Sequence, residues 1–225
     1  MKRLPMSMYV GLFVAAMAAP SLAADLPRPS YKAPIYSVPG YSWTGFYAGI
    51  NGGYGFGSSS WTGVGTSGSP SPKGALAGVT LGYNLQTGSW VWGIEGDFDY
   101  SWVKGSAIGT GACAAPGCET RNSWLATGRG RIGYAGWDRW LPYFTGGAAY
   151  GQVKMTPAVG AVESKNRLGW TLGGGVEYAV MSNWTAKLEY LYVDLGTSNC
   201  SGCAVGGVDV TFKESIVRAG LNYRF

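Results

Sequence analysis

The last eleven residues of the chain, 215–225, alternate between apolar and polar positions up to the final residue. The apolar positions are Val217, Ala219, Leu221, Tyr223 and Phe225, and the positions between them include Arg218 and Arg224. A period of two is typical of a β-strand with one apolar and one polar face. In the closing strand of a transmembrane β-barrel the outer face contacts lipid, the inner face lines a polar lumen, and pairing with the first strand leaves no open edge. The segment predicts such a closing strand.

The same alternation returns seven times before this segment. We expect strands at 43–56, 75–85, 90–102, 124–134, 140–152, 168–178 and 184–190, and a last one from about 208 to 225. The connections between them alternate long and short, starting with the Gly- and Ser-rich loop 57–73. Barrels with an even number of strands place long loops outside the cell, and short turns and both termini in the periplasm. The pattern predicts an eight-stranded antiparallel up-and-down transmembrane β-barrel with a lumen filled by side chains.

A soluble sandwich or lipocalin-like barrel would show the same alternation. It does not account for Trp, Tyr and Leu pointing outward while charged residues point inward, because that inverts the burial that a water-soluble barrel needs. The aromatic residues also gather near both ends of the strands, as in the girdles of a membrane barrel at headgroup depth. Those near short turns are Trp90, Trp137, Trp140, Trp184 and Tyr223, and those near long loops are Tyr54, Tyr100, Trp102, Trp124 and Trp170.

The first residues of the chain are typical of a secretory signal peptide. Lys2 and Arg3 form a basic start, an apolar run follows, and small residues occupy the −3 and −1 positions of a cut after Ala23. Cleavage after Ala24 is the weaker alternative, because Leu22 would then occupy the −3 position. A membrane-anchoring helix is the other interpretation, but the apolar run is shorter than the ~20 residues that a span needs.

Three segments follow from this interpretation. Residues 1–23 are expected to be the signal peptide, 24–42 a periplasmic arm, and 43–225 the transmembrane barrel. The arm holds four Pro residues, which exclude both a helix and the interior of a sheet and favour an extended chain. Removal of the signal peptide lowers the formal charge from +5 to +3, because two of the 17 basic residues are lost. The basic balance therefore says little about an anionic partner, and we expect no nucleic-acid binding.

The composition agrees with β-structure between two solvents. Gly is abundant at 38 of 225 residues without a collagen period, aromatic residues make up 14% and charged residues 13%. The sequence contains no His, so neither a Ser-His-Asp nor an Asp-His arrangement can be built. Gly173-Gly174-Gly175 lies within a predicted strand, not at a strand-to-helix turn, which argues against a phosphate loop. We expect no enzymatic activity, no catalytic or metal-binding residues and no cofactor.

Ten charged residues fall on positions that are predicted to point inward. They are Glu95, Asp97, Asp99, Arg129, Arg131, Glu177, Lys187, Glu189, Arg218 and Arg224. The lumen of an eight-stranded barrel is just wide enough for side chains, so we expect opposite charges to pair and fill it. A conduction path or a catalytic cluster is the alternative. The strands at 90–102 and 124–134 are complementary, acidic facing basic, although the sequence does not determine their register.

Four Cys residues occur in two predicted long loops. Cys113 and Cys118 lie in one loop, and Cys200 and Cys203 lie in the other. A secreted protein passes through an oxidising compartment, so we expect a disulfide within each loop. Pairing between the loops and a four-thiolate zinc site are the alternatives that the spacing leaves open.

Four segments carry a resemblance to a known family. They are AADLP at 23–27, WTGFYAG at 43–49, LPYFTGG at 141–147 and GLNYRF at 220–225. With them the chain resembles the alphaproteobacterial outer-membrane immunogenic proteins, a porin-superfamily group of eight-stranded barrels similar to the membrane domain of outer membrane protein A. The resemblance covers essentially the whole chain. It implies an abundant surface antigen of the cell envelope, in the outer membrane of a Gram-negative bacterium.

The resemblance also implies partners. A mature Ala-Asp N-terminus can be joined to peptidoglycan in this family, so Ala24 is a candidate attachment point. Tyr223 and Phe225 match the terminal aromatic signal that the barrel-assembly machinery recognises, and the barrel is expected to contact outer-membrane lipid and lipopolysaccharide.

The expected function is a structural, surface-exposed protein that contributes to envelope integrity. A small passive porin, or a loop-mediated receptor for a ligand or haem, is the alternative. Some family members are linked to haem binding. Without His, Met155 or a loop Tyr would have to bind the haem iron here.

Overall fold

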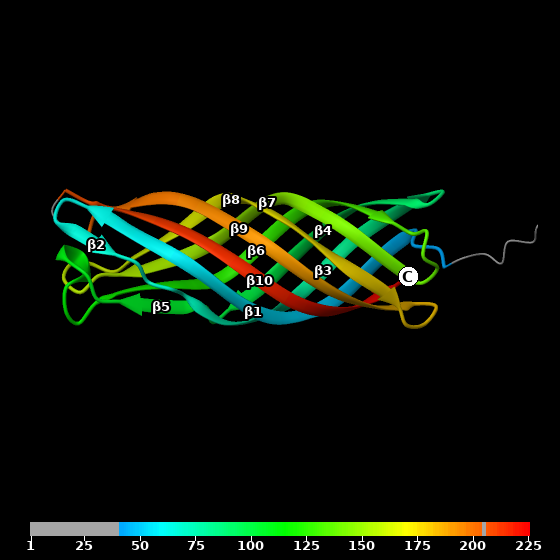
Figure 1. Cartoon of the computed structure of the whole chain (residues 1–225), viewed down its shortest axis with the longest axis horizontal. Helices are drawn as coiled ribbons and strands as arrows, with labels where there is room; N and C mark the ends of the chain where they lie inside the picture. The colour runs from blue at the N-terminus through cyan, green and yellow to red at the C-terminus, as the bar shows by residue number, and fades with distance from the viewer. Residues whose placement is uncertain (1–40, 204–205) are drawn as a thin grey trace, which may run out of the picture. The chain divides into compact units, whose positions relative to one another are not determined.

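The computed structural model describes residues 41–203 and 206–225, and nearly all of them lie in long antiparallel strands (Figure 1). The eight long strands are β1 (Gly45–Gly63), β3 (Lys73–Thr87), β4 (Trp90–Ser101), β6 (Cys118–Tyr134), β7 (Trp140–Thr156), β8 (Glu163–Ala179), β9 (Trp184–Cys200) and β10 (Val208–Arg224). Two short strands, β2 (Thr66–Gly68) and β5 (Lys104–Ala107), and one 3₁₀ turn, η1 (Gly111–Cys113), lie in the long connections. No helix in the described part of the chain has the length and apolar character to cross a membrane.

The long strands close into a barrel. Each pairs with its neighbours in the chain, and β10 pairs with β1 from Tyr47↔Arg224 to Gly63↔Val208. β1 pairs in turn with β3, so neither the first nor the last strand leaves an open edge. A sheet without an edge satisfies all its backbone hydrogen bonds internally, as lipid requires. The predicted fold, a closed eight-stranded antiparallel barrel, is confirmed.

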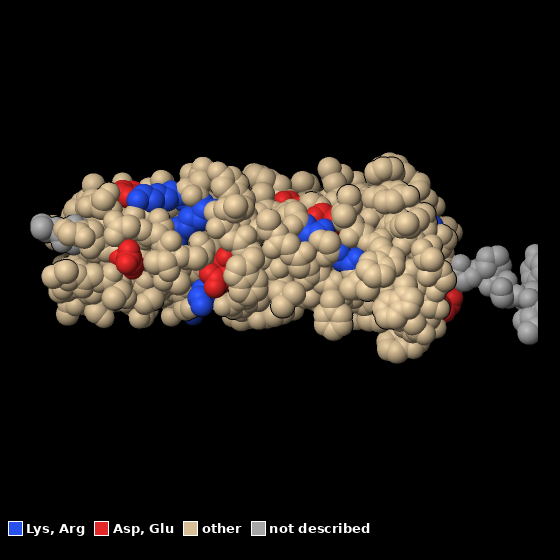
Figure 2. Space-filling view, turned by 90° about the horizontal axis from the view of Figure 1, so that it is seen from above, with Lys and Arg blue, Asp and Glu red and all other residues tan. Residues whose placement is uncertain are grey.

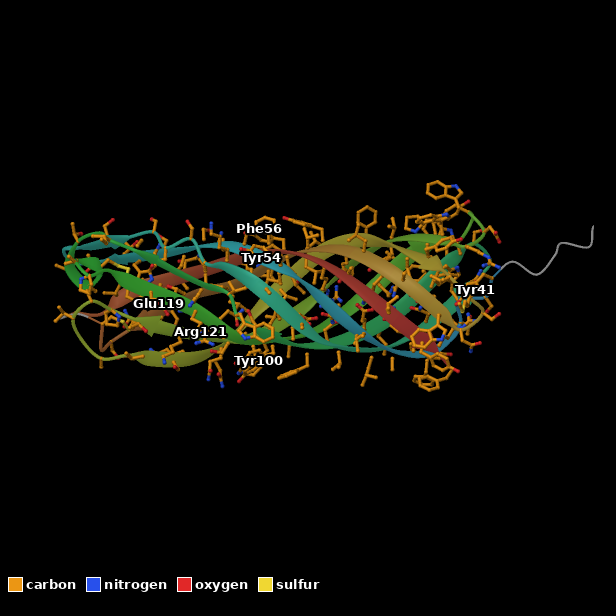
Figure 3. All side chains as sticks on the ribbon, turned by 90° about the horizontal axis from the view of Figure 1, so that it is seen from below. Tyr41, Tyr54, Phe56, Tyr100, Glu119 and Arg121 are labelled. Atoms are coloured by element: carbon orange, nitrogen blue, oxygen red, sulfur yellow. A yellow bond between two sulfur atoms is a disulfide. The ribbon has the colours of Figure 1, made fainter. Side chains whose placement is uncertain are left out.

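Side chains alternate across the wall of the barrel as predicted. The residues on the outer face are large, apolar and exposed. They include Phe46, Ile50, Leu81, Ile94, Phe98, Phe144, Leu172, Leu188 and Leu221. An aromatic band crosses the outer face at mid-length and includes Tyr54, Phe56 and Tyr100 (Figure 3). Phe144, at 75% exposure, would be a large solvent-exposed apolar surface in water, whereas in a bilayer it contacts acyl chains.

The strands are longer than predicted at the end that carries the long loops. β1 continues to Gly63 rather than ending near 56, β6 begins at Cys118 rather than near 124, and β9 continues to Cys200. Strands of 15–19 residues in β1, β3 and β9 exceed the roughly 10 residues that cross a bilayer. The segments predicted as loops therefore contain several residues of strand each.

The polarity of the wall reverses in these extra segments. Outside the aromatic band the exposed positions carry Ser, Thr, Lys and other polar residues, such as Ser58, Ser60 and Thr62 on β1. The largest charged patches on the face shown in Figure 2 lie over this end. A polar outer face and an apolar inner face suit a wall that is surrounded by water. These strand segments therefore do not show the apolar outer face by which the lipid-facing strands are predicted. We call this part of the barrel the long-loop section, and the part between the aromatic band and the short turns the membrane section.

The short turns and the start of the chain form the other end. Trp43 is buried there with Val91, Leu141 and Ala179, so an aromatic ring fills the lumen just before β1 begins. Gly88 takes a positive φ of 61° in the turn 86–89, which suits its lack of a Cβ. The predicted signal peptide, Ala23, Ala24 and most of the Pro-rich arm lie outside the described residues.

Candidate functional site: the lumen

Nine of the ten charged residues predicted to point inward lie together inside the membrane section. Their side chains come from β4, β6, β8, β9 and β10, and each residue is at most 5% exposed. This lumen charge cluster consists of Glu95, Asp97, Asp99, Arg129, Arg131, Glu177, Lys187, Glu189 and Arg218. Alternation explains the arrangement, because every second residue of a barrel strand points to the axis.

Arg129 lies at the centre of the cluster. Its guanidinium donates to Glu189 Oε1 at 2.9 Å and to Asp97 Oδ2 at 2.6 Å, and it also pairs with Glu95. Glu95 on β4 is the direct cross-strand partner of Arg129 on β6, so the two complementary strands do meet with an acid opposite a base. One cation thus connects three carboxylates from two sides of the barrel.

Arg218 joins the closing strand to the same carboxylates. Its Nε donates to Glu189 Oε2 at 2.8 Å, and its terminal nitrogens lie 3.0 Å from Asp97 Oδ1 and 3.0 Å from Asp99 Oδ2. Because β10 completes the barrel, these contacts connect the last strand to β4 across the lumen. Charge-assisted hydrogen bonds of this kind are about twice as strong as neutral ones.

Arg131 and Lys187 extend the cluster toward the short turns. Arg131 donates to Glu177 Oε2 at 2.6 Å, and Lys187 Nζ lies 2.9 Å from Glu95 Oε2. Neutral side chains that sequence reasoning did not single out complete the hydrogen bonds of the carboxylates. They are Tyr47, Thr80, Thr127, Tyr143, Thr185 and Asn222. Each occupies an inward position in the alternation of its strand, which we call inward parity. That parity is the signal that could have identified these residues.

The cluster contains five carboxylates and four cations, and every carboxylate forms an ion pair with at least one cation. Burial of an unpaired charge costs several kcal/mol, so each member depends on the others for its place in the lumen. The groups hold one another in ion pairs from opposite walls of the barrel. The chemistry of this arrangement is cross-linking of the wall and filling of the lumen.

Arg224 does not belong to the cluster, so its predicted pairing with lumen carboxylates is wrong. Its guanidinium stacks on the ring of Tyr41, 4.5 Å from the centroid, and donates to the carbonyl of Ser182 at 3.0 Å. Arg224 shares its face with Arg218, but it lies at the barrel end, where β10 finishes. The physical reason is position along the axis: parity gives the side of the wall and not the depth.

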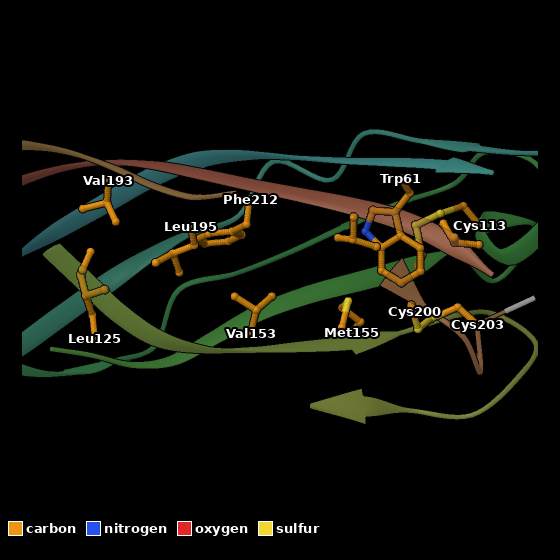
Figure 4. Packing of buried hydrophobic residues seen from close by; sticks show 14 of the residues in the cluster. Trp61, Cys113, Leu125, Val153, Met155, Val193, Leu195, Cys200, Cys203 and Phe212 are labelled. Carbon is orange, nitrogen blue, oxygen red and sulfur yellow. A yellow bond between two sulfur atoms is a disulfide. The ribbon is translucent and has the colours of Figure 1, made fainter. Parts of the chain in front are cut away.

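The interior of the long-loop section is apolar, which the sequence analysis did not predict (Figure 4). The inward side chains there form one buried cluster with both cystines. This apolar cluster includes Trp61, Leu76, Leu125, Val153, Met155, Leu191, Val193, Leu195, Val208, Val210, Phe212 and Ile216. Met155, the candidate haem ligand, is fully buried in it and accepts a contact from Arg167 at 3.7 Å. The lumen is therefore filled by charge pairs in one section and mainly by apolar side chains and the two cystines in the other.

Two further buried charged residues, Arg167 and Glu214, are absent from the predicted lumen charges. Arg167 donates to the carbonyls of Gly196 at 3.1 Å and Val210 at 2.9 Å. Glu214 accepts a hydrogen bond from Asn122 at 3.3 Å. Both point inward. Glu214 lies four positions before Arg218 on the predicted strand 208–225, so alternation could have identified it, whereas Arg167 lies just before the predicted strand 168–178.

The four Cys residues form one disulfide within each long loop, Cys113–Cys118 and Cys200–Cys203. No thiolate remains for the four-thiolate zinc alternative. Both cystines are fully buried against the apolar cluster. Glu163 on β8 holds the second loop, because the backbone N–H of Gly202 donates to its carboxylate and keeps the pKa of Glu163 below its ordinary value.

This geometry is that of a family of membrane proteins. The model of the outer membrane protein β-barrel domain matches residues 11–225, and the chain belongs to this family. The outer membrane of a Gram-negative bacterium is the location that the family defines.

Relatives across nearly the whole chain are outer-membrane proteins of alphaproteobacteria. The 31 kDa outer-membrane immunogenic protein of Brucella melitensis is 42% identical over 94% of this chain and 97% of its own length. The 25 kDa outer-membrane immunogenic protein of Brucella abortus is 33% identical over the full length of both chains. The 22 kDa outer membrane protein of Rhizobium leguminosarum is 34% identical over 86% of this chain and 82% of its own. The resemblance inferred from the sequence is confirmed.

Solved structures share the fold at low identity. Neisserial surface protein A has a TM-score of 0.52 at 14% identity, covering 81% of this chain and 98% of its own. The outer membrane protease OmpT of Escherichia coli has a TM-score of 0.53 at 10% identity, covering 80% of this chain and 97% of its own. At such identities the likeness concerns the barrel alone.

Proposed function

We propose that this protein is a structural component of the outer membrane that supports the integrity of the cell envelope, without enzymatic or channel activity. The observation that carries the proposal is the filled lumen. Ion pairs occupy the membrane section and the apolar cluster occupies the long-loop section. A barrel filled in this way gives its wall lateral rigidity, and its carboxylates are held by cations rather than free for acid–base chemistry.

The orientation follows from the asymmetry of the connections. The long connections with β2, β5 and both disulfides lie at one end, and the short turns lie at the other with the C-terminal residue (Figure 1). Short turns of membrane barrels face the periplasm. In the proposed orientation the long-loop section faces the outside, both termini are periplasmic, and the polar outer wall of the long-loop section lies in water.

The envelope role is tested by loss of the protein. A strain that lacks it is expected to be more sensitive to detergent and to take up more of a hydrophobic dye, and the full chain is expected to restore the barrier. In a parallel strain the deletion is complemented by the Arg218→Met variant, in which the lumen charge cluster is broken. A deletion strain with parental dye uptake and detergent resistance would contradict the proposal.

The N-terminal arm has a second proposed role, attachment to peptidoglycan through Ala24. The support is the resemblance of the Ala24-Asp25 segment to attached family members. Lysozyme digestion of the cell wall is expected to release an N-terminal peptide that carries a muropeptide, detected by mass spectrometry. A peptide that is never found with a muropeptide mass would overturn the attachment and leave the barrel's role untouched.

The C-terminal aromatic residues are proposed to bind the barrel-assembly machinery. Phe225 is 76% exposed, its ring contacts Tyr223 at 5.3 Å, and its N–H donates to the carbonyl of Phe46 at 3.0 Å. The backbone of Phe225 therefore connects the last strand to the first, while its ring stays exposed on the outside of the barrel. Deletion of Phe225 is expected to reduce the heat-modifiable, folded form in outer-membrane fractions, whereas Phe225→Tyr keeps it. Equal amounts of folded protein in both variants would reject the role.

A further inference from the structure

Four basic residues form one row across four neighbouring strands of the long-loop section. Lys73 on β3 lies opposite Lys104 on β5, Lys104 lies opposite Arg121 on β6, and Arg121 lies opposite Lys154 on β7. Residues directly opposite in a sheet point to the same face, so all four project from the outer wall. Lys73, Lys104 and Lys154 are exposed and Arg121 is half-buried. We call these four residues the basic row.

The row is unusual because like charges directly opposite one another destabilise a sheet. With neighbouring strands about 4.8 Å apart, four cations span roughly 14 Å. Within the described residues none of the four side chains forms an ion pair or a hydrogen bond to another side chain, and Nε of Arg121 is buried without an acceptor. The row thus presents four uncompensated cations to whatever lies beside the wall.

The acidic residue on the same face does not neutralise the row. Glu119 lies two positions from Arg121 along β6, opposite Ser106 on one side and Thr156 on the other. It lies further toward the long loops than Arg121 does (Figure 3). At its ends the row is bounded by Phe56 and Ser164, the cross-strand partners of Lys73 and Lys154.

The row lies directly against the aromatic band. Lys104 follows Trp102 by two positions, and Arg121 lies beside Tyr100 in Figure 3. Tyr100 and Trp102 pack edge to face at 4.7 Å, and Trp124 packs against Tyr150 at 5.4 Å just beneath the row. Aromatic bands of membrane barrels lie at headgroup depth, so the row lies at the height of the headgroups of the outer leaflet.

We propose that the basic row is a binding site for a lipid of the outer leaflet whose headgroup carries two phosphates. Four cations at one height match two phosphate groups in charge, and Arg121 can bind one of them through two parallel N–H donors. The apolar wall beneath the aromatic band receives the acyl chains of the same lipid. A soluble phosphate compound would gain no contact from that wall. The site rests on the proposed orientation, because it places the long-loop end at the outer leaflet.

A matched control lies at the same level of the wall on another side. Lys213 on β10 pairs with Asp194 at 3.5 Å, and its cross-strand neighbours on β1 and β9 are Ser58 and Asp194. It therefore offers one cation that is already compensated. A general attraction of the basic wall to anions would be weakened by Lys213→Gln as much as by any single change in the row.

The test is binding of bisphosphorylated lipid A to the full chain refolded in phosphatidylcholine nanodiscs, measured by native mass spectrometry. The quadruple variant K73Q/K104Q/R121Q/K154Q is compared with wild type and with K213Q. Each neutralised cation is expected to weaken binding by roughly fivefold, and K213Q to bind like wild type. Monophosphoryl lipid A is expected to bind more weakly than the bisphosphorylated form, and inorganic pyrophosphate more weakly still.

Three results would overturn the site. The quadruple variant could bind bisphosphorylated lipid A like wild type, K213Q could lose roughly fivefold in affinity, which is the loss expected for one cation of the row, or pyrophosphate could bind as tightly as the lipid. Heat-modifiable migration shows that each variant is folded before it is scored. The assay uses isolated protein, so loss of the site leaves the envelope phenotype of the deletion strain as an independent result.

Discussion

The membrane section and the long-loop section are made of the same strands, yet their cross-sections are inverted. In the membrane section Phe144 is exposed while Arg129 is buried; in the long-loop section Lys154 is exposed while Val153 is buried. Alternation continues through the boundary on β7, where Tyr143, Ala149, Val153 and Met155 are all buried, whereas on β6 a bulge between Asn122 and Trp124 shifts it by one residue. What changes across the boundary is the kind of residue that each face carries. The medium outside the wall therefore decides what each face carries, lipid in one section and water in the other.

The two sections also stabilise the lumen by different physics. Ion pairs in the membrane section are directional and depend on all partners, so loss of one member leaves another charge buried and unpaired. The apolar cluster depends on contact area and packing, so a truncation costs in proportion to the cavity that it leaves. Substitutions in the two sections should therefore differ in the size of the stability loss and in the region that loses protection.

The largest effect is expected from Arg218→Met, which removes one cation from the charge cluster. Asp97, Asp99 and Glu189 would each lose a partner, so the free energy of unfolding should fall by about 3–5 kcal/mol. Urea unfolding in lipid vesicles, followed by tryptophan fluorescence, measures the change. Arg224→Met is the control and should cost far less, because Arg224 lies outside the cluster. Equal losses in the two variants would mean that depth along the axis does not matter.

Phe212→Ala tests the other section. Phe212 is fully buried in the apolar cluster, and its truncation should lower the free energy of unfolding by about 3 kcal/mol. The loss should be the same at low and high salt, since no charge is involved. A loss from Phe212→Ala that varies strongly with salt would argue against a hydrocarbon interior.

The stability cost of a lysine on the outer wall should differ between the two sections, because one section is surrounded by lipid and the other by water. Phe144→Lys places a charge in hydrocarbon and should cost about 2–4 kcal/mol in vesicles. Ser60→Lys places the same charge on the long-loop section and should change stability by less than about 0.5 kcal/mol. The boundary that we draw would be misplaced if Ser60→Lys were as costly as Phe144→Lys.

Loss of a disulfide is expected to cost less than Arg218→Met, Phe212→Ala or Phe144→Lys. Each closes a loop of few residues, so the chain-entropy model gives about 2 kcal/mol for each. Cys200→Ser/Cys203→Ser should therefore raise hydrogen exchange in the long-loop ends of β9 and β10 and leave the membrane section protected. Cys113→Ser/Cys118→Ser does the same for β6. Increased exchange around Arg129 in either variant would show that the two sections are not independent.

Much of this architecture follows from parity alone. Alternation predicts the number of strands, the outward aromatic residues and the inward side of Glu95 and Arg129. It could not give depth, which is why Arg224 was placed in the lumen although it lies at the barrel end. Nor could it give register, because pairing such as Glu95↔Arg129 depends on contacts between distant segments.

The strand extensions of the long-loop section are not predicted from the sequence for a different reason. The predicted strands are those with an apolar outer face. In this part of β9 the apolar residues Leu191, Val193 and Leu195 point inward, and the polar residue Asp194 lies on the outer face. Strand pairing continues there because the hydrogen bonds of the sheet do not depend on which solvent lies outside. A pattern search that allows the polarity to invert along a strand would have found these extensions.

The central claim, that both sections of the lumen are filled, is tested most directly by conductance in a planar bilayer. The purified, folded wild-type chain is inserted and the steady current is recorded over a range of voltage, with the Arg218→Met variant measured beside it. The filled lumen predicts no steady open channel in wild type, and at most brief openings in the variant. A stable, voltage-independent open state in wild type would contradict the account and favour a small passive porin.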